Sequence, residues 1–230
     1  MARIFFALSL FVVALLAINV LLGFRIGDLQ TTARRVVAVR RELAEARQDL
    51  LAMPGKVEEL EQDLQTATAA YTPIRDQVRV HVLFGIAASL VTLLVNSITI
   101  TYFIGTSRWC KEVVDTYSLD EELADRSRRL KRGAWPWAVV GVISILAIVM
   151  MGAVSDPSSA NFENSVRWVL PHRLAALAGV GIIAWSLLMQ VGKIGANYEV
   201  IEQILDEVKE VRRTRGLDEL SEDALSRFRL

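Results

Sequence analysis

The chain has 230 residues, with 26 basic and 26 acidic side chains and a formal net charge of zero. Hydrophobic residues make up 53% of it and charged residues 23%, a balance that excludes a disordered or collagen-like chain. Because the apolar residues stand in long blocks, the pattern also argues against a soluble globular enzyme, and the neutral balance gives no support for nucleic acid as a partner.

Four apolar blocks are each long enough to cross a membrane as a helix, since a bilayer core of about 30 Å needs roughly 20 residues. None carries an acidic residue, and charged residues bound each one. We therefore predict an all-α polytopic membrane protein with transmembrane helices at 1–24, 82–105, 134–154 and 168–191. The first block is expected to be an uncleaved anchor, because its apolar core is longer than that of a typical signal peptide.

The segment 25–81 contains two runs of mostly apolar residues that step by three and four, the spacing of a coiled-coil seam. These are Leu29, Thr32, Val36, Val39, Leu43, Ala46, Leu50 and Met53, then Val57, Leu60, Leu64, Ala67, Tyr71, Ile74, Val78 and His81. Pro54 and Gly55 between the runs are where we expect the chain to reverse. The pattern predicts an extracytoplasmic antiparallel coiled-coil hairpin, with arms continuous with the flanking spans and a kink or local break at Pro73.

The segment 106–133 is predicted to be a basic cytoplasmic helical loop. In it, span two continues to Tyr117, and Ser118 to Glu121 form a capping box for a short helix that ends before Gly133. A short outer loop at 155–167 precedes the fourth span, and 192–230 is expected to be a cytoplasmic amphipathic helical tail with Gly216 as a C-cap. Excess Lys and Arg in 106–133 and in the tail places both termini in the cytoplasm, in a bacterial-type inner membrane or a plasma membrane.

Weakly polar residues form a stripe along one face of the second span. They are Ser89, Thr92, Asn96 and Thr99, spaced by three and four. Such residues let membrane helices approach closely and hydrogen-bond, so helix packing is the first interpretation and the lining of an oligomeric pore is the second. Ionisable residues are missing from the middle of each predicted span, which argues against a transporter.

His81 and His172 both begin spans that run inward, so both are expected near the outer membrane surface. Two imidazoles at one level could ligate a haem b as axial ligands, with Arg173 beside a propionate. The simpler interpretation is that they are structural, with no cofactor and no metal. The single Cys110 cannot form an internal disulfide and is interpreted as a bystander thiol.

No catalytic or nucleotide-binding motif is found, so no catalytic residue is assigned. The first hypothesis is therefore a non-enzymatic structural, assembly or signalling component in contact with membrane lipid, whose hairpin engages a partner protein or a second copy. The alternatives are a small membrane cytochrome or quinone-linked subunit using His81 and His172, and an oligomeric channel lined by the stripe of the second span.

Overall fold

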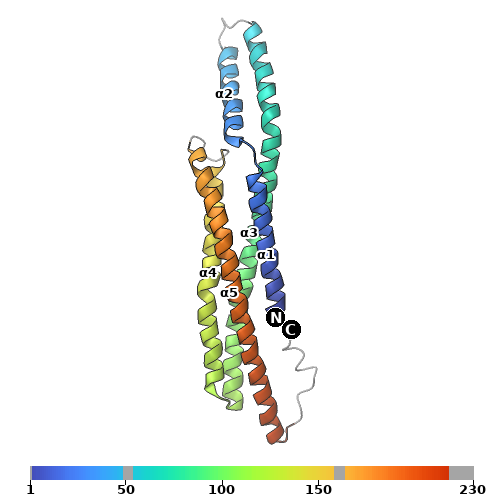
Figure 1. The fold of residues 1–230 in the computed structure, drawn as a ribbon, viewed down its shortest axis with the longest axis vertical. Helices are drawn as coiled ribbons and strands as arrows, with labels where there is room; N and C mark the ends of the chain where they lie inside the picture. Colours follow the sequence, from blue (N-terminus) through green and yellow to red (C-terminus); the bar gives the residue numbers. More distant parts are fainter. Residues whose placement is uncertain (1, 49–53, 158–163, 218–230) are drawn as a thin grey trace. The chain divides into compact units, whose positions relative to one another are not determined.

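The computed structural model describes residues 2–48, 54–157 and 164–217, and this part of the chain is helical apart from short connections (Figure 1). Its helices are α1 (Ala2–Phe24), α2 (Leu29–Gln48), α3 (Pro54–Tyr117), α4 (Glu121–Ser155) and α5 (Ser165–Thr214). The predicted all-α class is confirmed. All of these helices except α2 contain a stretch long and apolar enough to cross a membrane, in agreement with the four predicted blocks.

Large apolar side chains cover much of the outer surface of these four helices. More than half of the side-chain surface is exposed for Leu10 of α1, Leu90 of α3, Ile143 of α4 and Leu174 of α5. Extended apolar surface of this kind is unfavourable in water, whereas hydrocarbon solvates it well. The exposed residues therefore agree with the four helices being in contact with lipid.

The first arm of the predicted hairpin is not continuous with the first span. Helix α1 ends at Phe24 and α2 begins at Leu29, so the expectation of a nearly continuous helix is wrong here. Asp28 accounts for the new start, because its carboxylate accepts a hydrogen bond from the backbone N–H of Thr31 at 3.0 Å. Hydrogen bonding by the backbone and the side chain of Thr31 lowers the pKa of the Asp28 carboxyl, as expected of an N-cap.

The second arm is continuous with its span, as predicted, because α3 runs unbroken from Pro54 to Tyr117. Its 64 residues make a helix about 95 Å long. Of the predicted kink or local break at Pro73, the break is therefore wrong: proline removes one backbone hydrogen bond, and the rest of this long helix tolerates the loss. Pro54 and Gly55 belong to the first turn of α3, where proline is favoured, so the reversal expected at these two residues is wrong; residues 49–53 lie outside the described part of the chain.

The junction between α3 and α4 also differs from the prediction. Ser118 adopts a left-handed backbone conformation with φ of 55°, and the cap is Asp120, whose carboxylate accepts a hydrogen bond from the N–H of Glu122 at 2.9 Å. The capping box at Ser118 is therefore wrong. So is the short helix ending before Gly133, because α4 continues through Gly133 into the third apolar block.

Helix α5 likewise joins the fourth apolar block and the predicted amphipathic segment into one helix. Gly216 ends it in a left-handed conformation, φ 61°. The N–H of Gly216 donates to the carbonyl of Arg213, and the N–H of Leu217 donates to that of Arg212. This pair of hydrogen bonds is a Schellman motif, so the predicted C-cap is confirmed. The last part of the predicted helical tail, 218–230, lies outside the described residues.

The chain divides into two compact units, which we describe separately. Unit 1 comprises residues 1–14, 89–146 and 178–230, and unit 2 comprises residues 15–88 and 147–177. In unit 1, α3, α4 and α5 enclose an apolar cluster around Cys110, Val114, Leu123, Val200 and Ile204. Ile201, Ile204 and Val208, the apolar face of the predicted amphipathic segment, are buried in this cluster.

In unit 2, α2 lies beside the first part of α3 (Figure 1). The described residues of the predicted seam are all buried or half-buried; the fully buried ones are Val36, Val39, Leu43, Leu60 and Ala67. An ion pair between Arg47 and Glu61, 2.6 Å long, joins α2 to α3. Leu50 and Met53 lie outside the described residues.

Candidate functional site

Unit 2 brings together the two histidines of the chain, although 90 residues separate them in the sequence. His81 on α3 and His172 on α5 have ring centroids 6.5 Å apart and ring planes at 68°. Each ring is packed on a glycine of another helix. A Cβ atom added at Gly23 of α1 would lie 3.0 Å from Cε1 of His81, and one added at Gly152 of α4 would lie 3.1 Å from Cε1 of His172. The two glycines therefore create the space that the imidazoles occupy.

Hydrogen bonding orients one of the two imidazoles. The carbonyl of Asn19 lies 3.1 Å from Nδ1 of His81. Because a carbonyl can only accept, Nδ1 carries the proton in the neutral ring and Nε2 keeps its lone pair. A backbone carbonyl orients metal-ligating histidines in the same way, and it orients structural histidines equally well.

Two buried polar atoms in this cluster have no hydrogen-bond partner among the described residues: Oδ1 of Asn19 and Nδ1 of His172. Buried polar atoms without a partner are uncommon, and each calls for a hydrogen-bonding group such as a water molecule. Arg173, predicted beside a haem propionate, has its guanidinium 5.9 Å from the ring centre of Phe24. Nowhere in 2–48, 54–157 and 164–217 do three or more His, Cys, Asp or Glu side chains form a group that could hold a metal.

The polar stripe of the second span lies inside unit 1. Thr92, Asn96 and Thr99 are buried, and Ser89 is half-buried. The side-chain amide of Asn96 donates to the carbonyl of Thr92 at 2.8 Å, and its Oδ1 accepts from Nε2 of Gln190 on α5 at 3.0 Å. The stripe therefore takes part in hydrogen bonding between helices of one chain, an arrangement that favours helix packing over the lining of a pore between chains.

Two further contacts tie α4 into this network. A Cβ atom added at Gly141 of α4 would lie 2.8 Å from Oδ1 of Asn96, closer than atoms can approach. Ser186 of α5 accepts a hydrogen bond from Gln190 at 3.1 Å and donates one to the carbonyl of Trp137 at 2.5 Å. Oε1 of Gln190 is buried and has no hydrogen-bond partner among the described residues.

Asn197 of α5 forms a second buried polar cluster that the sequence analysis missed. Its Nδ2 donates to the hydroxyls of Tyr102 and Thr106 on α3, at 3.2 and 3.1 Å, and its Oδ1 accepts from Ser127 of α4 at 2.8 Å. Asn197 is completely buried although it lies beyond the predicted fourth span. Cys110 is also completely buried, and this burial raises the pKa of its thiol, which supports a bystander role.

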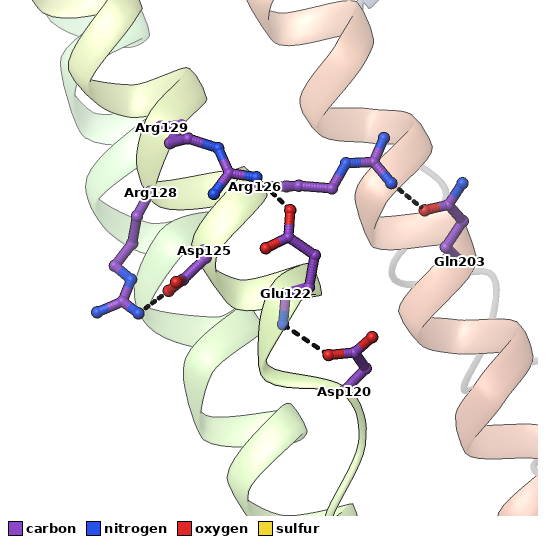
Figure 2. A network of polar contacts seen from close by, with 7 residues as sticks. All are labelled: Asp120, Glu122, Asp125, Arg126, Arg128, Arg129 and Gln203. Carbon is purple, nitrogen blue, oxygen red and sulfur yellow. Dashed lines mark hydrogen bonds and ion pairs between the residues drawn. The ribbon is translucent and has the colours of Figure 1, made fainter.

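The basic run between Arg126 and Arg132 splits into two groups. In the first, three arginines have polar partners: Arg126 bonds Gln203 of α5 at 2.8 Å, Arg128 pairs with Asp125, and Arg129 pairs with Glu122 (Figure 2). The second group is Lys131 and Arg132, which form no ion pair within the described ranges.

No protein-family model, curated protein or solved structure matches the chain, so its function is argued from its own residues.

Proposed function

We propose that the chain is a non-enzymatic integral membrane protein that crosses the bilayer four times, with both termini in the cytoplasm and a coiled-coil hairpin outside. Its role is structural, assembly or signalling, and the hairpin is the element that engages a partner protein or a second copy. The observation that carries this proposal is that α2 and the first part of α3 lie side by side in unit 2, with Val39, Leu43 and Leu60 of the predicted seam buried and charged residues exposed.

The base of the hairpin has its own attachment within unit 2. The side-chain amide of Gln30, in the first turn of α2, donates to the carbonyl of Ser155 at the end of α4, at 3.1 Å. Its Oε1 accepts from the hydroxyl of Ser165 at the start of α5, also at 3.1 Å. One side chain thus links α2 to two other helices, so a load or signal on the hairpin is expected to reach α4 and α5.

The hairpin also carries apolar surface that its own seam leaves uncovered. Val37 of α2 is 50% exposed, and Ala44 lies two turns further along the same face. A two-helix pair buries little surface and is marginal by itself. A second pair of helices packed on this face would complete a four-helix bundle, which supports association through α2.

Cysteine cross-linking at Val37 tests association through this face. In a Cys110→Ser background, Val37→Cys is expected to give a covalent dimer of the chain, or a covalent complex with another protein, when membranes are oxidised. Glu42→Cys, an exposed position about 140° around the helix from Val37, is the matched control and is expected to cross-link much less. Equal cross-linking at both positions, or none at either, would contradict association through this face of the hairpin.

Deleting the hairpin tests the same function in another way. Removal of residues 31–79 with the ends joined is expected to abolish any complex recovered by pull-down of the tagged full chain from detergent-solubilised membranes. An unchanged complex would show that the hairpin is not the element that engages the partner.

The histidine pair favours one second candidate function, a small membrane cytochrome with His81 and His172 as axial ligands of haem b. Since a metal–imidazole bond is about 2 Å long, two imidazoles on opposite sides of one metal have ring centres roughly 6 Å apart. The observed centroid separation is 6.5 Å. Purified protein with a Soret band that disappears in His172→Ala would support this function, and a featureless visible spectrum in both redox states would reject it.

A further inference from the structure

An apolar cavity on α4, open to the surface, has Lys131 and Arg132 in its lining, and neither of them forms an ion pair within the described residues. The cavity has a volume of about 570 Å³ and is lined by Lys131, Arg132, Trp135, Pro136, Val139 and Val140. These positions recur at intervals of four, so they follow one face of the helix over three turns. Cationic side chains thus occupy one end of the cavity, and aliphatic side chains occupy the other.

The three arginines that precede the cavity bond to side chains of the chain itself. Arg128 and Arg129 pair with carboxylates of α4 itself, and Arg126 bonds Gln203 (Figure 2). Lys131 and Arg132 form no ion pair within the described residues, so their charge is available to an external anion.

The other end of the cavity continues into the apolar surface of α4. Trp135 is 42% exposed and Val139 is 44% exposed, and Ile143, one turn further, is 60% exposed. Tryptophan is favoured where hydrocarbon meets lipid headgroups. The sequence of surfaces along α4 is therefore cationic, then aromatic, then aliphatic.

We propose that this cavity binds an anionic phospholipid, with its phosphate on Lys131 and Arg132 and its acyl chains along Val139 and Val140. A free phosphate ion would satisfy the two cations but would leave the aliphatic part of the cavity uncovered. A zwitterionic lipid would cover the aliphatic part but would bring its own cation next to Lys131 and Arg132. A lipid with a net negative headgroup matches both ends, and its acyl chains account for the apolar lining.

The lipid site rests on the proposed function, because α4 must lie in the membrane. The experiment therefore measures membrane insertion separately from lipid preference. The full chain is purified in detergent and mixed with equal amounts of phosphatidylglycerol and phosphatidylcholine of the same acyl composition. Native mass spectrometry then gives the ratio of the two lipids bound. Flotation with vesicles of pure phosphatidylcholine checks membrane insertion independently: a chain that fails to insert contradicts the membrane function itself, whereas an inserted chain without lipid preference contradicts only the cavity proposal.

The charge test compares two double variants that each remove two positive charges. Lys131→Gln with Arg132→Gln is expected to lower the preference for phosphatidylglycerol by roughly 30-fold, since each basic residue near an anionic headgroup contributes a factor of about five. Arg128→Gln with Arg129→Gln is the matched control and is expected to keep the preference. An equal loss in both double variants would mean that only the overall charge matters and would overturn the site.

The shape test keeps both charges and fills the cavity. Val140→Trp is expected to abolish the preference for phosphatidylglycerol, whereas exchange of the two cations, Lys131→Arg with Arg132→Lys, is expected to retain it. Circular dichroism and gel filtration establish that each variant is folded. If Val140→Trp is folded and keeps the full preference, the lipid does not occupy the cavity and the proposal is wrong. If Val140→Trp does not fold, the comparison of the Lys131/Arg132 and Arg128/Arg129 double variants still tests whether the lipid binds at this cavity.

Discussion

The side-chain amide of Gln190 on α5 donates a hydrogen bond to Oδ1 of Asn96 on α3 at 3.0 Å, with both residues fully buried. Asn96 also donates to its own helix, at the carbonyl of Thr92. The two amides thus connect α3 and α5 where both helices have apolar outer surfaces. Such a pair favours one packing arrangement of the two helices, because in any other arrangement each buried amide would lack its hydrogen-bond partner.

Asn96→Leu and Gln190→Leu are therefore expected to be non-additive. Each single variant leaves a buried amide with one partner fewer, at a cost of about 1–3 kcal/mol in stability. The double variant removes both amides and should recover part of that loss, with a coupling energy of about 0.6–1.7 kcal/mol, the range for membrane helices. Unfolding of the purified protein in mixed micelles measures all four stabilities. Strictly additive losses would mean that the two side chains do not interact.

Gly141→Ala tests the close approach of α4 to the same amide. The added methyl group would lie 2.8 Å from Oδ1 of Asn96, so the helices must separate or the amide must move. We expect a destabilisation of about 1–3 kcal/mol, as for other overpacked sites. Gly105→Ala is the control, because nothing lies within 4 Å of a Cβ atom there, and it should be neutral or slightly stabilising. Thermal unfolding in detergent compares the two, and equal effects would argue against the contact.

Cys110 is expected to resist thiol reagents while the protein is folded. Its side chain is fully buried in the cluster of α3, α4 and α5, and burial raises the pKa of the thiol, so little reactive thiolate is present at neutral pH. Labelling with a maleimide should be slow in the native protein and complete within minutes after unfolding in SDS. Asp115→Cys, exposed on the same helix, should label quickly under native conditions. Equal native rates at the two positions would show that the cluster is open.

Much of the architecture could be predicted from the sequence because lipid imposes a simple requirement. A stretch of roughly 20 apolar residues without charge is recognisable in any chain, and the four blocks were found in this way. The seam of the predicted hairpin was equally visible, because apolar residues recur every three or four positions and most positions between them are polar or charged. Burial of Val36, Val39 and Leu43 follows that period.

The helix boundaries were harder to predict because they depend on competing local interactions. Asp28 starts a new helix where the sequence suggested continuity, and Asp120 rather than Ser118 caps α4. A carboxylate at either position forms a hydrogen bond with a nearby N–H, but whether it does so depends on the path of the whole chain. At Pro73 the sequence suggested a break that does not occur, because this proline lies within the continuous helix α3.

The polar contacts were predicted in part. The stripe containing Asn96 could be predicted from its spacing, but its hydrogen bond with Gln190 of α5 could not. Asn197 was missed because it follows the last apolar block, where a polar side chain is expected to face water. Its burial comes from the packing of α3 and α4 around it, which no local pattern reveals. The same applies to the histidines, whose common level could be predicted but not their separation of 6.5 Å.

The central claim, that α3 crosses the membrane and carries the hairpin outside, is tested most directly by cysteine accessibility at its two ends. In a Cys110→Ser background, Glu58→Cys and Asp115→Cys place exposed thiols near the start and the end of this one helix. With a membrane-impermeant maleimide on intact cells, the account predicts labelling of Glu58→Cys at once and of Asp115→Cys only after lysis. Labelling of both thiols in intact cells, or of neither, would contradict it.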